Sequence, residues 1–426
     1  MPTGADVVGA ALRLHNVVRR TPLQFNDRLS EATGLNVWLK REDLQPVRSY
    51  KLRGAYNLMA QLPEERRSAG VVCASAGNHG QGVAYACRHL GIDGAVVVPA
   101  TTPRQKRDRI RALGGERVEV VVTGDTYDEA KAASERIAAE RGATLVPAFD
   151  DPRTIAGQGT IAPEIVEDLG RAPDAVIAPV GGGGLIGGLI AWLGQFSPST
   201  RVIGVEPAGA ASAAAALAAG GPVDLPHLDT FVDGAAVRRM GELPYAIVRD
   251  AGADFVSVDE GAVCTEMLNL YQVEGIIAEP AGALTPTALA TGLIGSSAAP
   301  GEDHAISLPQ GATVVAVLSG GNNDVSRYSE IVERSLVHEG RKHYFLVSFP
   351  QEPGALRRFL DGVLGPDDDI ALFEYTKKSN RELGPALVGL ELGDPADLPG
   401  LLDRIATSPL TVEPIDPTGP FYRFLV

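Results

Sequence analysis

The sequence has few cysteines, no run of basic residues and no long apolar segment free of glycine and proline. Its three cysteines, Cys73, Cys87 and Cys264, are scattered, form no CxxC pair and have no histidine at ligand spacing. Neither a disulfide framework nor a zinc site is therefore expected, and a reducing compartment is the simpler interpretation.

Positive charge is scarce relative to negative charge: the net charge is −15 and the isoelectric point is near 5.0. This charge repels polyanions, so no nucleic-acid partner is expected. The N-terminal stretch carries Asp6 and Arg13 and lacks the apolar core of a secretory signal. One charge-free stretch, residues 175–200, is broken by glycine and proline into a predicted strand, loop and helix, so no membrane partner is expected. We therefore expect a cytoplasmic protein.

The order of apolar and amphipathic segments in the sequence is typical of an α/β protein. Its 426 residues fit two or three domains, and hydrophobic residues at 45% and charged residues at 21% are close to globular averages. Between residues 36 and 206, short apolar runs alternate with segments of helical length; these runs are residues 71–74, 95–98, 118–121 and 176–178. Strands that are apolar on both faces predict a parallel sheet covered by helices on each side.

The pattern changes from residue 342 onward. Alternating and helical spacings there predict strand, helix, strand, strand, helix and strand, the last at residues 421–426. The boundary is placed after the amphipathic run 325–337, which gives domains of residues 1–338 and 339–426. The second domain is an α/β sandwich too small for another catalytic domain, so binding or regulation is its expected task.

The first candidate for chemistry is Lys51, which follows a polar turn and opens a helix-forming run. The positive end of a helix dipole destabilises an ammonium group, so this amine is more easily neutral and nucleophilic than a lysine at a helix C-terminus. Imine formation with an aldehyde cofactor requires such an amine. Taken alone, the segment is equally compatible with a solvated surface lysine.

The second candidate is the loop Ser75-Ala76-Gly77-Asn78-His79-Gly80, placed directly after the predicted strand 71–74 and before a helix. Backbone N–H groups at a helix start favour anions, so the loop suits a substrate carboxylate while Asn78 donates a hydrogen bond to a cofactor oxygen. A glycine-rich turn capped by Asn78 is the alternative.

The third candidate is the run Gly181-Gly182-Gly183-Gly184 after the predicted strand 175–180. Successive glycines before a helix expose N–H groups at the positive end of its dipole, which is the chemistry of a phosphate cradle. Gly182, Gly184 and Gly187 also match the dinucleotide fingerprint, with Glu206 at about the expected distance. The run alone does not distinguish a nicotinamide cofactor from a phosphorylated coenzyme.

The fourth candidate is Ser319, which ends the buried-type strand 314–318 and precedes two glycines. Ligands bind at the carboxyl edge of a parallel sheet, and a serine hydroxyl can hydrogen-bond a neutral pyridine nitrogen without protonating it. An N-cap of the next helix is the alternative role for this serine.

Taken together, these four segments, in this order and spacing, resemble the fold-type II pyridoxal-phosphate enzymes and, among them, the biosynthetic threonine dehydratases (threonine ammonia-lyases). The resemblance covers nearly the whole chain. It implies two open, twisted α/β subdomains, the smaller at about residues 50–150, followed by a C-terminal ACT-like α+β regulatory domain. It also implies dehydration and deamination of L-threonine to 2-oxobutanoate and ammonia, the first committed step of isoleucine biosynthesis.

The resemblance also implies which residues form the site. Lys51 is the catalytic residue and carries pyridoxal 5'-phosphate. The other residues implied to bind the cofactor are Asn78, Gly181, Gly182, Gly183, Gly184 and Ser319. Those implied to bind the substrate are Ser75, Ala76, Gly77 and His79.

Regulation and assembly are implied in the same way: an amino-acid effector, with isoleucine expected, acts through the C-terminal domain, and the chain forms a homo-oligomer, a tetramer or dimer. Two departures separate the sequence from the related serine racemases. Ala76 stands where those enzymes have a second acid/base serine. Ser212 stands where their cation site has an aspartate next to the counterpart of Glu206, so no divalent metal is expected.

Three other functions remain open from the sequence. A sister fold-type II enzyme, such as a serine dehydratase or threonine synthase, shares the four segments. A nicotinamide-dependent dehydrogenase would use Gly182, Gly184, Gly187 and Glu206. A non-catalytic amino-acid sensor would be built on the C-terminal domain.

Overall fold

The computed structural model describes residues 1–297, 305–375, 382–416, 419, 421–422 and 425. Its internal contacts divide the chain into two compact units, residues 1–323 and 324–426. The division falls before the amphipathic helix α15 (Tyr328–His338), not after it. Glu333 on this helix accepts hydrogen bonds from Tyr344 and Lys342 on the following strand, β13 (Lys342–Pro350).

The larger part of the first unit is built around a six-stranded sheet in the order β1-β2-β12-β7-β8-β9. Only the edge strand β1 is antiparallel. The central strands β12 and β7 are buried along their whole length, which explains their uninterrupted apolar sequences. The strands are β1 (Leu23–Phe25), β2 (Asn36–Arg41), β7 (Ala175–Pro179), β8 (Arg201–Pro207), β9 (Asp254–Val258) and β12 (Thr313–Leu318).

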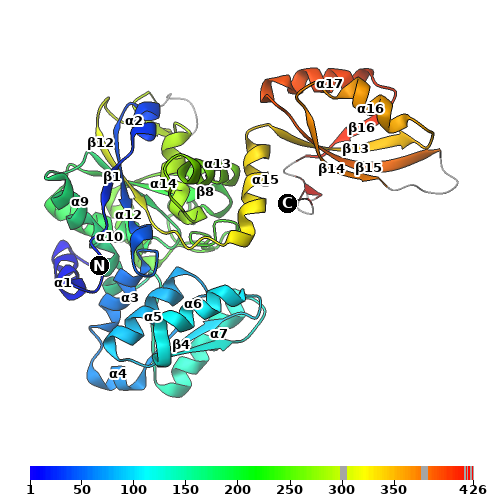
Figure 1. The fold of residues 1–426 in the computed structure, drawn as a ribbon. Coiled ribbons are helices and arrows are strands. Elements are labelled where there is room, and N and C mark those ends of the chain that lie inside the picture. Colours follow the sequence, from blue (N-terminus) through cyan, green and yellow to red (C-terminus); the bar gives the residue numbers. More distant parts are fainter. Residues whose placement is uncertain (298–304, 376–381, 417–418, 420, 423–424, 426) are drawn as a thin grey trace. The chain divides into compact units, whose positions relative to one another are not determined.

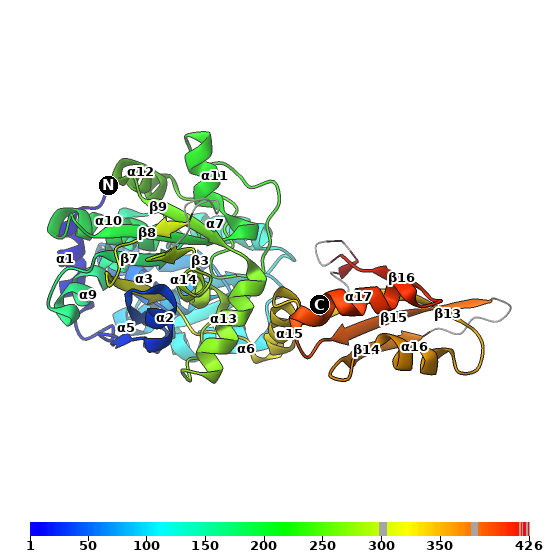
Figure 2. The ribbon, with the colours of Figure 1, turned by 90° about the horizontal axis from the view of Figure 1, so that it is seen from above.

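Helices cover both faces of this sheet: Figure 2 shows α10 and α12 on one side of β7 and β8, and α13 and α14 on the other. Apolar side chains of α10 pack against those of β7 and β12. The helices are α1 (Gly4–Leu14), α2 (Asp27–Thr33), α8 (Pro152–Gly159), α9 (Ile161–Leu169), α10 (Gly184–Phe196), α11 (Ser212–Ala219), α12 (Glu242–Ala251), α13 (Glu260–Gln272) and α14 (Pro280–Ala290). Two short strands, β10 (Ile294–Gly295) and β11 (Ile306–Ser307), pair in parallel nearby.

The smaller subdomain of this unit is a four-stranded, fully parallel sheet in the order β5-β4-β3-β6, shown in blue and cyan in Figure 1. One apolar cluster joins α3, α5 and α6 to one face of the sheet, and a second joins α7 to the other face. The elements are α3 (Lys51–Met59), α4 (Glu64–Ala69), β3 (Val71–Ala74), α5 (Asn78–Leu90), β4 (Gly94–Val98), α6 (Arg104–Gly114), β5 (Val118–Val122), α7 (Tyr127–Arg141) and β6 (Thr144–Leu145). The predicted α/β class with two open parallel subdomains is confirmed.

The charge-free stretch 175–200 folds as predicted into a strand, a glycine loop and a helix, β7 and α10. None of the helices in the described part of the chain has the length and apolar character needed to cross a bilayer.

The second unit continues from α15 into a four-stranded antiparallel sheet in the order β14-β15-β13-β16, with α16 and α17 packed on its apolar face. The elements are β13 (Lys342–Pro350), α16 (Ala355–Val363), β14 (Asp369–Tyr375), β15 (Leu383–Glu391), α17 (Leu398–Thr407) and β16 (Thr411–Pro414). The predicted order of strands and helices is confirmed, as expected for an ACT-like α+β domain.

The position of the closing strand was predicted wrongly. Phe421, Tyr422 and Leu425 lie in turns, and the other three residues of the predicted strand 421–426 lie outside the described residues. The fourth strand is instead β16, which pairs with β13 at the sheet edge. Its only half-buried apolar residue is Val412, so its sequence carries almost no alternating pattern.

Candidate active site

Lys51 is the first residue of α3, and the segment before it is hydrogen-bonded to the loop after β12. The Tyr50 N–H donates to the Ser319 carbonyl at 3.1 Å, and the Gly321 N–H donates to the Arg48 carbonyl at 2.9 Å. Arg48 adopts a positive φ of 57°, a backbone conformation uncommon outside glycine. The predicted lysine and serine segments therefore lie side by side.

The side chain of Lys51 is half-buried, with its Nζ 5.1 Å from the centre of the Tyr50 ring. No described side chain forms an ion pair or hydrogen bond with this amine. Helix α5 passes close to it: a Cβ on Gly82 would lie 3.0 Å from the Leu52 nitrogen and 3.1 Å from the Lys51 carbonyl carbon. Lys51 therefore offers an amine not committed to a structural ion pair, close to the helix that begins with Asn78.

The asparagine loop ends at the N-terminus of α5, whose first residue is Asn78. The loop is tight, since a Cβ on Gly80 would lie 2.2 Å from the Ser75 carbonyl oxygen. Ser75, Ala76, Gly77 and Asn78 are all partly accessible. The unpaired N–H groups of a first helical turn face this opening and suit an anion such as a carboxylate.

His79 is the one loop residue whose side chain is directed elsewhere. It is 5% exposed, and its Nε2 lies 2.7 Å from the Val146 carbonyl oxygen. Burial lowers the pKa of His79 to about 4, with a smaller contribution from the charge of Lys51, so the ring is neutral and its Nε2–H donates to Val146. Only the backbone of His79 is placed to meet a substrate.

The four glycines are held so tightly that no side chain would fit. A Cβ on Gly181, Gly182 or Gly184 would lie 2.7 Å from the Ala235 carbonyl oxygen, 2.2 Å from the Phe149 ring and 2.5 Å from Gln158 Oε1, respectively. Gly183 has a φ of 86° and is the N-cap of α10. The loop therefore presents backbone N–H groups at the positive end of a helix, as a phosphate cradle requires.

A methyl group at position 182 is expected to damage this cradle. In Gly182→Ala the Phe149 ring must move or the loop must deform, so the dissociation constant for pyridoxal phosphate should rise at least about tenfold, the equivalent of ~1.4 kcal/mol. Fluorescence titration of the apoprotein measures this. Gly194→Ala, in the helix α10 that follows the loop and with nothing within 4 Å of the added Cβ outside the helix's own backbone, is the control and should bind normally.

Ser319 follows the last residue of β12 and is 2% exposed. Its Oγ donates a long hydrogen bond of 3.3 Å to the Ala281 carbonyl, and the hydroxyl can rotate to another acceptor. The neighbouring backbone is closely packed, because a Cβ on Gly320 would lie 2.2 Å from Glu279 Oε1.

The chain path brings the four segments to one place. β7 and β12 are parallel neighbours, so the loops that follow them, at Gly181 and Ser319, leave the same edge of the large sheet. Segment 234–235 connects the glycine loop to the asparagine loop: Gly181 packs on Ala235, and a Cβ on Gly234 would lie 4.0 Å from Asn78 Nδ2. The predicted site residues thus surround one region between the two subdomains.

Glu206 does not have the role that the dinucleotide fingerprint assigns to it. Its two carboxylate oxygens accept hydrogen bonds from the Ala213 and Ala214 N–H groups at 2.7 and 2.9 Å, at the start of α11. Burial raises the pKa of Glu206 to about 7. A carboxylate used as a helix cap is not free to bind a ribose, so the structure disfavours the nicotinamide alternative. Within the described residues no three His, Cys, Asp or Glu side chains cluster as metal ligands would.

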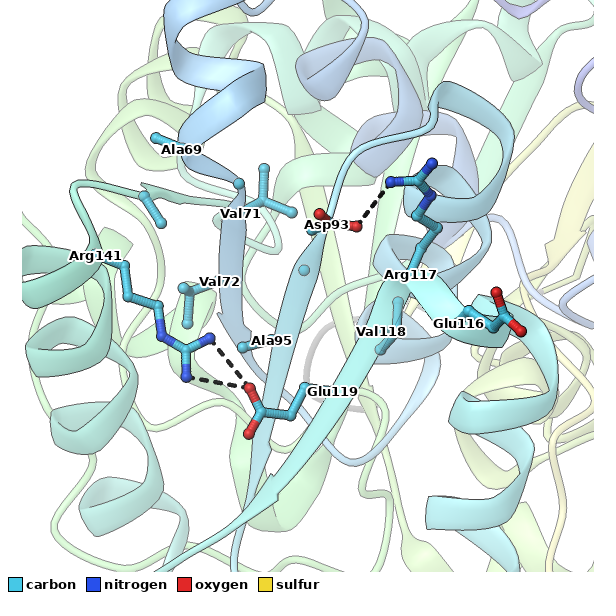
Figure 3. A pocket seen from close by; sticks show the side chains of 13 residues that line it. Ala69, Val71, Val72, Asp93, Ala95, Glu116, Arg117, Val118, Glu119 and Arg141 are labelled. Atoms are coloured by element: carbon cyan, nitrogen blue, oxygen red, sulfur yellow. Dashed lines mark hydrogen bonds and ion pairs between the residues drawn. The ribbon is translucent and has the colours of Figure 1, made fainter.

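A pocket at the opposite end of the small sheet is not part of this site. It is lined by the amino ends of β3, β4 and β5, whereas the asparagine loop leaves the carboxyl end of β3. Figure 3 shows that both of its arginines are paired with acidic residues of the lining, Arg117 with Asp93 at 3.0 Å and Arg141 with Glu119 at 3.1 Å.

Comparison with known proteins agrees with this geometry. Residues 14–320 match the family described as pyridoxal-phosphate dependent enzyme, and residues 333–425 match the C-terminal regulatory domain of threonine dehydratase. The chain is 61% identical to the biosynthetic L-threonine dehydratase of Mycobacterium tuberculosis over its full length and 96% of that relative. The chain belongs to the biosynthetic threonine dehydratases. Its cofactor is pyridoxal phosphate.

Solved structures show the same relationship. The processed form of threonine deaminase isoform 2 from Solanum lycopersicum superposes with a TM-score of 0.70 at 38% identity, over 79% of this chain and 96% of that one. Maize serine racemase superposes with a TM-score of 0.70 at 29% identity, over 79% and 98%. The shared fold includes racemases, so substrate and reaction depend on individual site residues.

The residues present fit the cofactor. The glycine cradle suits a phosphate, and the rotatable Ser319 hydroxyl suits a ring nitrogen. Ser49 supplies a further indication: it is fully buried next to Lys51, and its hydroxyl has no hydrogen-bond partner among the described residues. A buried hydroxyl of this kind is costly unless a ligand or water satisfies it.

Sequence reasoning missed several residues that the structure brings to the site. Asn322 and Glu279 are not among the predicted site residues, yet both form hydrogen bonds with the Asn78 side chain. Arg53, two residues after Lys51, is fully buried and paired with Glu42 and Glu164. No spacing signal marks such contacts, because the partners lie far apart in the chain.

Proposed function

We propose that this chain converts L-threonine to 2-oxobutanoate and ammonia by eliminating the β-hydroxyl as water, the committed step toward isoleucine. The observation that carries the proposal is the convergence of an uncommitted lysine amine, a glycine cradle and an anion-binding helix start around one region. The family relationship independently supports the same reaction. Cytoplasm is the proposed location.

Each site residue has a task that its position supports. Lys51 Nζ would hold the cofactor by a covalent bond to its aldehyde carbon, and the same amine would serve as the base that removes the α-proton of the substrate. The backbone N–H groups from Ser75 to His79 hold the substrate carboxylate at the start of α5. The glycine loop would hold the phosphate, and the Ser319 hydroxyl would donate to the ring nitrogen. Pyridoxal phosphate, when bound, withdraws electrons from the α-carbon and so makes its proton acidic.

The side chain at position 76 argues for elimination over racemisation. Racemisation requires a proton donor on the face of the substrate opposite the lysine, and the alanine at this position has no acidic proton to give. Steady-state rates on threonine, serine and phosphohomoserine separate this proposal from a serine dehydratase or a threonine synthase. Turnover of phosphohomoserine without turnover of threonine would refute it.

We also propose that the second unit binds an amino-acid effector, with isoleucine as the inhibitor, that catalysis belongs to the first unit, within the predicted range of residues 1–338, and that the chain forms a homo-oligomer, a tetramer or dimer. The family match over residues 333–425 supports a regulatory task for this part of the chain. Light scattering of the purified chain tests the oligomeric state.

Loosening the core of the second unit is expected to remove feedback without removing catalysis. Phe359 on α16 is 1% exposed, and its ring centre lies 5.4 Å from that of Phe349 on the sheet. Phe359→Ala should destabilise this unit by about 3–5 kcal/mol. The isoleucine concentration for half inhibition should rise at least about tenfold, while turnover without isoleucine stays near wild type. Leu356→Ala, on the exposed side of the same helix, is the control; equal loss of feedback there would contradict the assignment.

A further inference from the structure

Glu279 is a buried carboxyl group next to the cofactor site to which no task has been assigned. It is 4% exposed and precedes the first residue of α14. Its Oε1 accepts a hydrogen bond from Asn78 Nδ2 at 2.6 Å, and its carboxylate also accepts from the Asn322 backbone N–H. Lys106, whose charge reaches Glu279, is itself paired with Asp233 at 2.9 Å.

The orientation of the Asn78 amide can be derived from a backbone carbonyl. Asn322 lies 2.8 Å from the Val47 carbonyl oxygen, which can only accept, so the Asn322 atom facing it is the donor Nδ2. The same Nδ2 lies 2.7 Å from Asn78, which must therefore present its Oδ1. Asn78 Nδ2 is then left to face Glu279.

These hydrogen bonds determine which groups of the Asn78 amide remain available to a ligand. The amide nitrogen has two hydrogens, and one of them is used by Glu279. The oxygen is used by Asn322. Asn78 therefore presents a single N–H in a defined direction, which suits the phenolic oxygen of the cofactor ring and not a donor.

We propose that Glu279 is a positioning residue that acts through Asn78, holding the amide so that its remaining N–H meets the ring oxygen of pyridoxal phosphate. The inference rests on the proposed cofactor role of Asn78 and goes beyond it. Without the Glu279 acceptor, the amide is anchored on its oxygen side only and can rotate about its side-chain bonds.

The charges around Glu279 fit this task. Burial, and then the charge of Asp233, raise the pKa of Glu279 to about 7, while the N–H groups of Asn78 and Asn322 and the charge of Lys106 favour its ionised form. In either protonation state at least one carboxyl oxygen remains an acceptor for Asn78. The amide orientation therefore holds on both sides of neutral pH.

The test compares five full-length variants by two readouts that do not depend on turnover: the dissociation constant for pyridoxal phosphate and the visible absorption maximum of the holoprotein. Glu279→Ala should raise the dissociation constant at least about tenfold and shift the absorption maximum. Glu279→Gln keeps an acceptor oxygen and should restore most of both. Glu266→Gln alters a buried carboxyl on α13 that is paired with Arg28 of α2, and it should change neither readout.

The decisive variant is the double substitution. If Glu279 acts through Asn78, Glu279→Ala should add no further change in an Asn78→Ala background. Additive effects there would overturn the proposal, as would a wild-type spectrum and affinity in Glu279→Ala. If Asn78→Ala itself changes neither readout, the assignment of the cofactor site fails instead. Should Glu279→Ala not fold, Glu279→Met, which also removes the acceptor oxygens but fills more of the space, gives the same comparison in both backgrounds.

Discussion

Replacing Lys51 with alanine is expected to leave a folded protein without a visible absorption band and with turnover reduced at least about 10³-fold. The amine is both the point of covalent attachment for the cofactor and the base for the α-proton, so no other group compensates. Its half-buried position without a described ionic partner is consistent with both tasks.

Borohydride reduction followed by peptide mapping checks this expectation directly. Wild-type protein should carry a pyridoxyl group on Lys51, and Lys51→Arg, which keeps the positive charge, should carry none and remain inactive. Lys131→Ala changes an exposed lysine on α7 and should be labelled and active like wild type. A pyridoxyl group on a different lysine would contradict the site described above.

The second large effect is expected at Arg53. This guanidinium is fully buried and forms paired hydrogen bonds with Glu42, at 2.9 and 2.8 Å, and with Glu164, at 2.7 and 2.9 Å. Burial opposes ionisation of Glu42, but the charge and hydrogen bonds of Arg53 and the charge of Lys40 outweigh it and lower the pKa of Glu42. The network anchors the first turn of α3, where Lys51 lies.

Arg53→Met is therefore expected to destabilise the first unit by about 3–5 kcal/mol, because it leaves the buried Glu42 carboxylate without its hydrogen-bonded counter-charge. Cofactor should be lost at lower urea concentration, measured by the visible band. Arg20→Met provides the control, since Arg20 also pairs with two acids but is 51% exposed, and such a pair contributes only about 0–1 kcal/mol. Equal losses of stability in the two variants would show that burial of the ion-pair network does not determine its contribution to stability.

Much of the fold follows from local sequence patterns. The apolar runs at residues 71–74 and 176–178 became parallel strands because a strand covered by helices on both faces must be apolar on both faces. The weak pattern of β16 shows the limit of this reasoning: an edge strand with one half-buried residue carries no comparable signal, and its place was predicted wrongly.

The candidate site likewise has a part that local sequence predicts and a part that it does not. Gly181 to Gly184 were identifiable because positions packed too closely for a Cβ atom tolerate only glycine, which leaves a run of glycines in the sequence. The partner of Asn78 was not identifiable, because Glu279 lies 201 residues further along the chain and many acidic residues could have met it.

The sequence by itself determined the parallel α/β architecture, the lysine at a helix start and the glycine loops, because burial of strands and exclusion of Cβ atoms act on consecutive residues. Only the tertiary structure decided that Glu279 and Asn322 orient Asn78, that Arg53 joins Glu42 to Glu164 and that Glu206 caps a helix. These contacts depend on which distant segments pack together in the interior. A buried polar group there must form a hydrogen bond with one of the residues that the fold places next to it.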